Sequence, residues 1–388
     1  MVYDMPRVPD YSDLDEYLPH FFLGGSKKII KETKDALELM KQASNLGSIM
    51  KFELSEETRD AIQEAVARWK EPPLAKAHQA ILPCFDLMLA LTEKYAAVVM
   101  NPPYMGSGNM NATLSQYVKD NYPEGKADLC TTFMLMQADR TVERGYYANI
   151  VPPSWMFLST FEGLRRSIID NQTIQSLLHL SRGVFGADFG SVSTVIQNCE
   201  TNNGHGTYFR LIERTFQEFD QNHLRMLFEK TLENHDFRFF FADYTKDVTD
   251  IVYSENGAKI YYPNVEQKNF EKIPGKTIGY WLSDSMINAF GQPSLSVFVK
   301  SGKGLDTGDN NRFLRYWHEI NHFTLGLGFK TATDAKASLK KWFPFNKGGT
   351  FRKWYGNNEY VINWENDGEE LRSFELSNLR NRIFYFVE

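Results

Sequence analysis

Apolar residues recur along the chain first with helical spacing and then in short runs. The spacing predicts helices over residues 28–42, 55–70 and 75–93. From residue 95 onward, short apolar runs alternate with helical patterns. The runs predict strands over residues 96–100, 146–151, 174–180, 192–197 and 208–212, and the patterns between them predict helices over 128–144 and 159–169.

This alternation predicts the α/β fold class, with an open sheet. The first strand, Ala96–Met100, is continuously apolar, which is typical of a parallel sheet that is covered on both faces. Ligands of such sheets bind at the carboxyl ends of the strands. Asn101 follows the first strand directly, so we expect it at that edge of the sheet.

Composition narrows the functional classes. The 388 residues carry a net charge of −6, which excludes a histone-like polycation but not an enzyme with a local basic surface. Cys84, Cys130 and Cys199 are widely spaced, so we expect neither a disulfide framework nor a zinc knuckle. The chain shows no signal-peptide core and no apolar run of the ~20 residues that a membrane span needs. We therefore expect a soluble, cytoplasmic protein with no membrane partner.

The tetrapeptide Asn101-Pro102-Pro103-Tyr104 carries the candidate chemistry. The asparagine side chain can accept a hydrogen bond, the prolines make the loop rigid and leave its carbonyls as acceptors, and the tyrosine offers a flat face. Two acceptors beside a stacking ring form a receptor for a planar group that bears an NH2. Holding both hydrogens would push the amine toward tetrahedral geometry, so that its lone pair could attack an electrophilic methyl group without a base, thiol or metal.

Such a tetrapeptide is typical of amino-methyltransferases. A target base in duplex DNA has to be swung out of the stack at a cost of a few kcal/mol, and stacking on Tyr104 would offset that cost by ~1–3 kcal/mol. Enzymes that methylate protein glutamine or RNA guanine use the same chemistry, and a Pro-Pro turn after a strand also arises without function. The aromatic and basic region after the sheet favours DNA, as substrate or as the ligand of a non-catalytic binding protein.

Several stretches resemble a known family. They read V-V-M-N-P-P-Y-M-G-S-G-N-M-N at 98–111, K-A-D-L-C-T-T-F-M at 126–134 and G-Y-Y-A-N-I-V-P-P-S-W-M-F-L-S-T-F-E-G-L-R at 145–165, with further stretches at 307–319 and 342–360. Together they are similar to adenine-specific DNA methyltransferases of the PglX type, found in BREX phage-exclusion systems. The resemblance implies a partial Rossmann-like class I methyltransferase sheet followed by a mixed α+β target-recognition region. It also implies S-adenosylmethionine as cofactor and double-stranded DNA as substrate.

The resemblance assigns roles by position. Asn101 and the Pro102 carbonyl would hold the N6 amine of adenine, and Tyr104 would stack on the flipped base. Asp128 would help to shape the cofactor and base pockets. Phe157 would form a second wall for the base, or it is a core aromatic.

One part of the family's pattern is missing. A glycine-rich S-adenosylmethionine loop would precede Asn101, but the only glycines there are Gly24, Gly25 and Gly47, and none lies between a strand and a helix. We therefore expect a fragment that is inactive alone and is completed by a separately encoded N-terminal piece or by other phage-defence subunits. The expected divisions are a helical lead-in (1–94), the catalytic half of the methyltransferase domain (95–213), a connector or insertion (214–276) and the start of a target-recognition region (277–388).

Residues 330–353 hold seven basic residues against one acid, with aromatic residues between them. This pattern predicts contacts to phosphates and bases, or else a solvated loop anchored by its aromatics. The candidate DNA-binding residues are Lys340, Lys341, Lys347, Arg352 and Lys353.

Two further motifs have alternative interpretations. Residues 318–322 read His-Glu-Ile-Asn-His, which matches a zinc signature but lies within a stretch that resembles the methyltransferases. We predict no metal site there. Pro83-Cys84 matches the nucleophile dipeptide of cytosine C5-methyltransferases, but no partner residues accompany it, and we expect Cys84 to be a small buried side chain.

Overall fold

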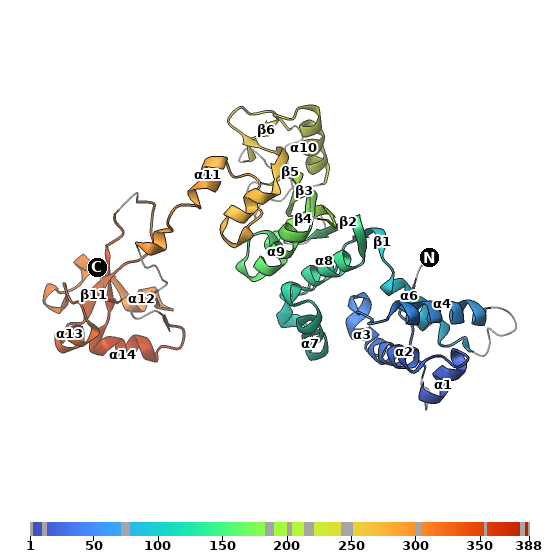
Figure 1. Ribbon diagram of the computed structural model, residues 1–388. Helices are drawn as coiled ribbons and strands as arrows, with labels where there is room; N and C mark the ends of the chain where they lie inside the picture. Colours follow the sequence, from blue (N-terminus) through green and yellow to red (C-terminus); the bar gives the residue numbers. More distant parts are fainter. Residues whose placement is uncertain are drawn as a thin grey trace. The chain divides into compact units, whose positions relative to one another are not determined.

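The computed structural model describes residues 3–9, 14–70, 78–182, 190–199, 204–212, 221–241, 251–298, 304–352, 355–380 and 385–386. The chain forms two compact units, an N-terminal unit (Met1–Gln292) and a C-terminal unit (Pro293–Glu388). Figure 1 shows the elements of each unit. No helix in the described part of the chain is long and apolar enough to cross a membrane.

The N-terminal unit begins with packed helices. They are α1 (Leu14–Phe21), α2 (Lys27–Met40), α3 (Ala43–Leu46), α4 (Glu56–Lys70) and α6 (Leu82–Thr92). Their buried residues form one core with residues of α7 (Ala112–Asn121) and α8 (Leu129–Asp139). The helices predicted over 28–42 and 55–70 are confirmed. In the third predicted helix, α6 covers Leu82–Thr92, residues 79–81 form a turn that separates it from the helical residue 78, and positions 71–77 lie outside the described residues.

Six strands form the main sheet. They are β1 (Tyr95–Met100), β2 (Thr141–Val151), β3 (Thr173–Arg182), β4 (Gly190–Gln197), β5 (His205–Arg210) and β8 (Tyr261–Glu266). Their order is β1-β2-β4-β3-β5-β8. β1 is parallel to β2 and β3 to β5, whereas β4 and β8 run antiparallel to their neighbours. The predicted α/β class is therefore confirmed, with a mixed sheet.

Helices cover the centre of this sheet on both faces. On one face, α8 packs on β2 and α9 (Glu162–Asn171) packs on β3, and their apolar residues share a core with Leu177 and Tyr208. On the other face, α10 (Gln221–Glu233) shares a core with Phe209. The two-stranded sheet of β6 (Arg238–Phe239) and β7 (Ala258–Lys259) lies in that second core. The centre of the sheet is thus a rigid frame.

The edge strand β1 is less covered than the sequence predicts. Among the described residues only its β2 side is paired. Val98 packs against the core beneath α8, so strand alternation turns Ala97 and Val99 to the opposite face. Val99 is 75% exposed, and Ala97 is exposed as well. The prediction of cover on both faces is therefore wrong for β1 in this part of the chain.

The helix predicted over 128–144 is too long at its carboxyl end. α8 ends at Asp139, where the N–H of Arg140 donates to carbonyls of the last turn, and β2 begins at Thr141. The pairing with β1 then skips residues up to Tyr146, and Arg144 within this bulge has a φ of 61°. The prediction failed because a bulged strand start has no regular period that sequence spacing can reveal.

The described residues of the C-terminal unit form two small sheets. One has the order β10-β12-β11, with β10 (Leu314–Tyr316), β12 (Tyr360–Asn363) and β11 (Trp342–Phe345), and the other pairs β9 (Leu305–Asp306) with β13 (Asn378–Leu379). The helices are α12 (Asn310–Phe313), α13 (Ala332–Ala337) and α14 (Glu365–Ser373). Phe313, Phe343 and Trp364 lie in its core. The last helix of the N-terminal unit is α11 (Asp284–Ala289).

Candidate functional site

The loop Asn101–Tyr104 leaves the sheet at the carboxyl end of β1. Met100, the last residue of that strand, pairs with Asn149 of the parallel strand β2. The Tyr104 hydroxyl donates to the backbone carbonyl of Ile150, 2.9 Å away, and so ties the loop to β2. The loop is therefore anchored at the edge of the sheet where the parallel strands β1 and β2 both end.

Tyr104 also orients the asparagine. Its hydroxyl also lies 2.9 Å from Asn101 Oδ1, so its single hydrogen is shared between this oxygen and the Ile150 carbonyl. An amide oxygen has two lone pairs, so this contact leaves one for a further N–H donor. Burial raises the pKa of Tyr104, so the hydroxyl keeps its proton at neutral pH. The side chain of Asn101 is exposed, while Pro102 behind it is buried and Pro103 is exposed. The loop thus presents an oriented acceptor to solvent on a buried base.

Asp128 fixes the segment that follows the loop. Its carboxylate accepts the N–H of Cys130 at 2.9 Å, which caps α8, and the N–H of Met105 at 3.2 Å. Leu129 N–H donates to the Met105 carbonyl at 2.9 Å, so the two segments are joined twice. The resemblance implied that Asp128 shapes the cofactor and base pockets. The contacts give it a role in holding the backbone directly after Tyr104.

Phe157 lies in the turn after β2, at the same end of the sheet as Asn101. Its ring is 36% exposed and packs at 6.0 Å from the His179 ring and 5.8 Å from the Trp281 ring, measured between centroids. The Arg210 guanidinium lies over Trp281 at 5.0 Å. The Phe157 ring is therefore held by two aromatic neighbours while the residue stays partly exposed.

His179 is a buried polar residue that sequence analysis missed. It lies on β3 opposite Val192 of β4, which in turn pairs with Val151 at the end of β2. Burial and then the nearby charge of Arg210 lower the pKa of His179 to about 4, so the ring is neutral at neutral pH. The available signal was a histidine inside the apolar run of a predicted strand, S-L-L-H-L. Trp281 carried no comparable signal.

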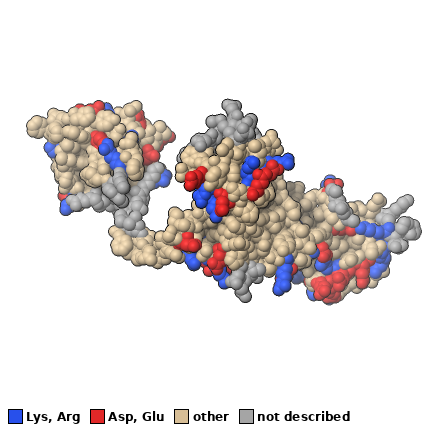
Figure 2. All heavy atoms as spheres, turned by 90° about the horizontal axis from the view of Figure 1, so that it is seen from above, with Lys and Arg blue, Asp and Glu red and all other residues tan. Residues whose placement is uncertain are grey.

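The candidate DNA-binding residues of the C-terminal unit have internal partners. Lys340 Nζ donates to the Phe323 carbonyl at 2.5 Å, and Lys347 Nζ lies 5.2 Å from the centre of the Tyr360 ring. Two further cations form exposed ion pairs, Lys341–Glu365 and Arg352–Glu359, each with an N···O distance of 3.0 Å. On the face drawn in Figure 2, basic and acidic side chains lie intermixed. Lys353 lies outside the described residues.

The alternative motifs gain little from their surroundings. His318 lies in the 3-10 turn η10 (Trp317–Glu319), and His322 starts a separate turn, η11 (His322–Thr324), so they are not one turn apart on a single helix. No group of three or more His, Cys, Asp or Glu residues that could hold a metal ion occurs in the part of the chain that the structure describes. Cys84 is buried, and burial raises its pKa to about 11, which leaves a neutral thiol.

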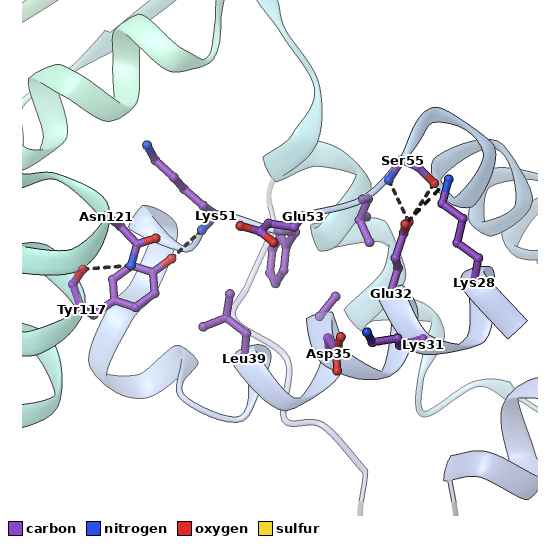
Figure 3. A pocket seen from close by; sticks show the side chains of 13 residues that line it. Lys28, Lys31, Glu32, Asp35, Leu39, Lys51, Glu53, Ser55, Tyr117 and Asn121 are labelled. Carbon is purple, nitrogen blue, oxygen red and sulfur yellow. Dashed lines mark hydrogen bonds and ion pairs between the residues drawn. The ribbon is translucent and has the colours of Figure 1, made fainter.

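A pocket of about 760 Å³ lies between α2, residues 51–55 and α7, and it is separate from the loop Asn101–Tyr104. Figure 3 shows Glu32 inside it, accepting hydrogen bonds from the backbone N–H and the hydroxyl of Ser55, both at 2.8 Å. Hydrogen bonds from Thr58 and Ser55 lower the pKa of Glu32 to about 2. The other charged residues that line the pocket are Lys28, Lys31, Asp35, Lys51 and Glu53. Both signs occur in equal number, and no residue of Asn101–Tyr104 lines the pocket, so we assign it to the helical packing.

A family comparison matches the part of the chain that contains the candidate site. Residues 24–185 match the model of the family described as Eco57I restriction-modification methylase. This segment contains Asn101–Tyr104, Asp128 and Phe157, the residues that surround the end of β1 and β2.

Two curated proteins extend the likeness along the chain. The "Adenine-specific methyltransferase BrxX" of Escherichia coli O9:H4 (strain HS) is 35% identical over 367 residues, which cover 91% of this chain and 27% of that protein. The "Adenine-specific methyltransferase PglX" of Lacticaseibacillus casei (strain Zhang) is 36% identical over 290 residues, 73% of this chain and 22% of that protein. The resemblance predicted from the sequence is confirmed. The chain spans about a quarter of the length of these relatives.

Among solved structures, the chain is similar to the methyltransferase subunit of a type I restriction-modification system from Streptococcus thermophilus. The identity is 12%, the TM-score is 0.30, and the match covers 49% of this chain and 38% of that one.

Proposed function

We propose that this chain carries the amine-binding part of an S-adenosylmethionine-dependent DNA methyltransferase that acts on adenine N6. One observation carries the proposal: Asn101 is exposed at the end of β1, and its Oδ1 lies 2.9 Å from the Tyr104 hydroxyl, which is also within 2.9 Å of the Ile150 carbonyl of β2. The similarity to two adenine-specific methyltransferases supports the choice of adenine.

In this proposal the loop activates the amine by holding it. Asn101 Oδ1 and the Pro102 carbonyl accept the two N–H groups of the adenine amine, which draws the nitrogen toward tetrahedral geometry and directs its lone pair away from the loop. S-Adenosylmethionine, when bound, supplies the electrophilic methyl group. Attack of the nitrogen on that methyl group would break the sulfur–methyl bond and release S-adenosylhomocysteine, and the methylated nitrogen would lose one proton to solvent. The raised pKa of Tyr104 keeps the hydroxyl of that residue neutral throughout.

Two aromatic side chains would contain the flipped base. Tyr104 offers one face and the half-exposed Phe157 another, and both lie at the same end of the main sheet. Stacking is worth ~1–3 kcal/mol per base, which is comparable to the few kcal/mol that extrusion of a base costs. The aromatic walls therefore offset base flipping while the acceptors select the amine.

The described residues do not make a complete cofactor site. Upstream of Asn101 the chain has no strand followed by a glycine-rich loop and a helix. The Asp128 carboxylate accepts the backbone N–H groups of Met105 and Cys130 and so serves the fold of this segment. We propose that a further polypeptide segment docks on β1 and supplies that loop. Within the described residues the apolar strand β1 has one unpaired edge and an exposed Val99, which favour a parallel apolar strand as the partner.

Double-stranded DNA would be held by the C-terminal unit. The candidate residues flank β11 of the sheet β10-β12-β11 in the sequence, and they are Lys340, Lys341, Lys347 and Arg352. Lys353 is proposed on sequence alone. Exposed ion pairs are worth only ~0–1 kcal/mol, so their cations can exchange a carboxylate for a phosphate at small cost. The proposal of DNA as the ligand of this unit therefore rests on its own basic residues.

The test is to identify the methylated product. The 388-residue chain, alone and co-expressed with the open reading frame immediately upstream, is incubated with unmethylated plasmid DNA and isotope-labelled S-adenosylmethionine. The digested nucleosides are then separated by mass spectrometry. We expect labelled N6-methyldeoxyadenosine in the co-expressed sample. Label on cytosine would overturn the assignment, and so would label on RNA or protein glutamine, but not on DNA, when total RNA and protein are added to a parallel reaction. DNA binding without any methylation would indicate a non-catalytic DNA-binding protein.

A charged substitution on the exposed face of β1 tests the proposed docking without disturbing the fold of the chain. Val99→Lys adds a cation at a position that is 75% exposed, so the chain itself should fold unchanged. We expect it to abolish complementation by the upstream segment. Lys119→Ala, an exposed change on α7, is the control and should leave complementation intact.

A further inference from the structure

Arg165 is a fully buried cation on α9 that the proposed mechanism does not use. Its Nη1 donates to the Trp155 carbonyl at 2.7 Å and to the Leu158 carbonyl at 2.8 Å. These two carbonyls lie on either side of Phe157 in the chain. The N–H of Phe157 donates to the Ser154 carbonyl at 3.2 Å. The backbone that carries the Phe157 ring is therefore fixed from both directions.

The same guanidinium reaches a second loop. Arg165 Nε donates to the carbonyl of Gly275, 110 positions away, at 2.8 Å. Gly275 has a φ of 69°, and a Cβ there would lie 3.3 Å from Arg165 Nη2, so glycine permits the close approach. Ile278 N–H donates to the Met156 carbonyl at 3.1 Å, which joins the two loops directly.

The second loop leads to the ring that supports Phe157. It continues to Trp281, whose ring lies 5.8 Å from that of Phe157 at an interplanar angle of 64°. The side chain of Arg165 thus connects the backbone under Phe157 to the segment that supplies its neighbour. Arg165 is thus hydrogen-bonded to both segments that carry the rings in contact, Phe157 and Trp281.

An arginine at this place is unfavourable if its role is packing alone. Burial of a cation costs free energy that an apolar side chain of similar size does not cost. Nη2 of Arg165 has no hydrogen-bond partner among the described residues, which adds to that cost. What a guanidinium supplies, and an apolar chain cannot, is a set of directed donors to three carbonyls on two loops.

We propose that Arg165 is a positioning residue that holds the Phe157 ring in place as one wall of the base pocket. It acts by clamping residues 155–158 to the loop that leads from Gly275 to Trp281. This inference rests on the proposed function, because it requires Phe157 to contact the target base. Arg165 itself touches neither the base nor the methyl donor.

A double-mutant cycle on base binding tests the inference. The 388-residue chain is titrated with a single-stranded oligonucleotide that contains one 2-aminopurine flanked by thymidines, and its fluorescence gives the dissociation constant. The variants are Arg165→Met, Phe157→Ala and the pair together. Arg166→Met is the matched control, because Arg166 is exposed and pairs with Glu162 along the helix.

We expect Phe157→Ala and Arg165→Met each to weaken binding by about tenfold, within the range that stacking of one base supports. The pair should be no weaker than either single variant, because Arg165 acts through Phe157. Arg166→Met should bind as the wild type does. If Arg165→Met binds normally while Phe157→Ala does not, or if the two effects multiply, the inference is wrong. If neither Phe157→Ala nor Tyr104→Ala weakens binding, the proposed base pocket fails and the inference fails with it.

Hydrogen exchange gives a readout that needs no DNA. We expect Arg165→Lys, which keeps the charge but loses the fork, to raise amide exchange in residues 154–158 and in 275–281 together. The amides of β3 should keep their protection, which separates this effect from general unfolding. Faster exchange in only one of the loops, or no change in either, would contradict the clamp.

Discussion

The end of the main sheet and the basic segment of the C-terminal unit present functional groups in opposite ways. At the sheet end, exposed groups rest on partners that are partly or fully buried: Asn101 on Tyr104, and Phe157 on His179 and Trp281. In the basic segment, cations such as Lys341 and Arg352 are paired with exposed carboxylates. Chemistry needs fixed positions, whereas attraction of a phosphate backbone needs only charge within reach.

The difference teaches where mutations should act. Removing a group at the sheet end leaves a defined vacancy in a rigid frame, so one substitution should have a large and specific effect. Removing an exposed cation takes away one of several similar charges, so its effect should be small and salt-dependent. We therefore expect the largest effects at the sheet end and the smallest at surface charges.

Two substitutions of Tyr104 separate the contribution of its ring to base binding from that of its hydroxyl. Tyr104→Ala removes the stacking face and should weaken binding of the 2-aminopurine oligonucleotide by ~1–3 kcal/mol. Tyr104→Phe keeps the face and loses only the donor to Asn101 and Ile150, so its loss of affinity should be clearly smaller. Fluorescence titration measures both. Equal losses in the two variants would mean that the hydroxyl, not the ring, carries the interaction.

Substitutions of Asp128 test how much this residue stabilises the fold by capping α8 and binding the Met105 N–H. Asp128→Ala should lower the free energy of unfolding by about 1–2 kcal/mol, because it removes the acceptor of the Cys130 and Met105 N–H groups. Asp128→Asn should recover most of that loss, since asparagine also caps helices. Urea denaturation measures the difference. Asp120→Ala, at an exposed aspartate, should be nearly neutral, and an equal loss there would remove the special role of Asp128.

The basic segment should behave as a set of interchangeable charges. Lys340→Ala with Lys341→Ala should weaken binding of duplex DNA a few-fold, whatever its sequence. The slope of log affinity against log salt should fall in magnitude by up to about 1.8, because each phosphate that a lysine neutralises adds ~0.9 to it. Titrations at several salt concentrations give the slope. Lys31→Ala with Lys119→Ala is the control in the N-terminal unit, and an unchanged slope in the first pair would count against the proposed DNA surface.

Glu32 and Glu365 compare a held carboxylate with an exposed one. Hydrogen bonds keep the folded pKa of Glu32 at about 2, below its ordinary value of 4.5. The stabilisation is therefore present above pH 4.5 and is lost as the pH falls toward 2. Glu32→Gln should cost under about 1 kcal/mol at neutral pH, and the difference from wild type should shrink in acid. Thermal melts from about pH 7 to about pH 3 check this. Glu365→Gln, which removes an exposed ion pair with Lys341, is the control and should change stability little at neutral pH.

The elements that could be predicted from the sequence are those with a strong local pattern. Strong local patterns were sufficient for α2 and α4, and the apolar run before Asn101 was sufficient to place that residue after a strand. The bulged start of β2 was not predictable, because its backbone is set by pairing with β1 and by the cap at Arg140.

Contacts between distant segments were out of reach for the same reason. The Arg165–Gly275 hydrogen bond joins positions 110 apart, and the ring contact of Phe157 with Trp281 spans a similar distance. A pattern within a short window contains no information about such partners. The open face at Val99 was missed because a continuous apolar run looks the same whether both faces are covered or one is free.

The central claim is that Asn101 holds the reactive amine. Methyl transfer to DNA, measured as N6-methyldeoxyadenosine by mass spectrometry in the co-expressed sample, tests it most directly when Asn101→Ala is compared with the wild type. Loss of one preorganised hydrogen-bonding partner at a reacting centre costs about 10²–10³ in rate. We predict a loss of that size, with DNA affinity and folding unchanged. A variant that methylates adenine at the wild-type rate would contradict the account.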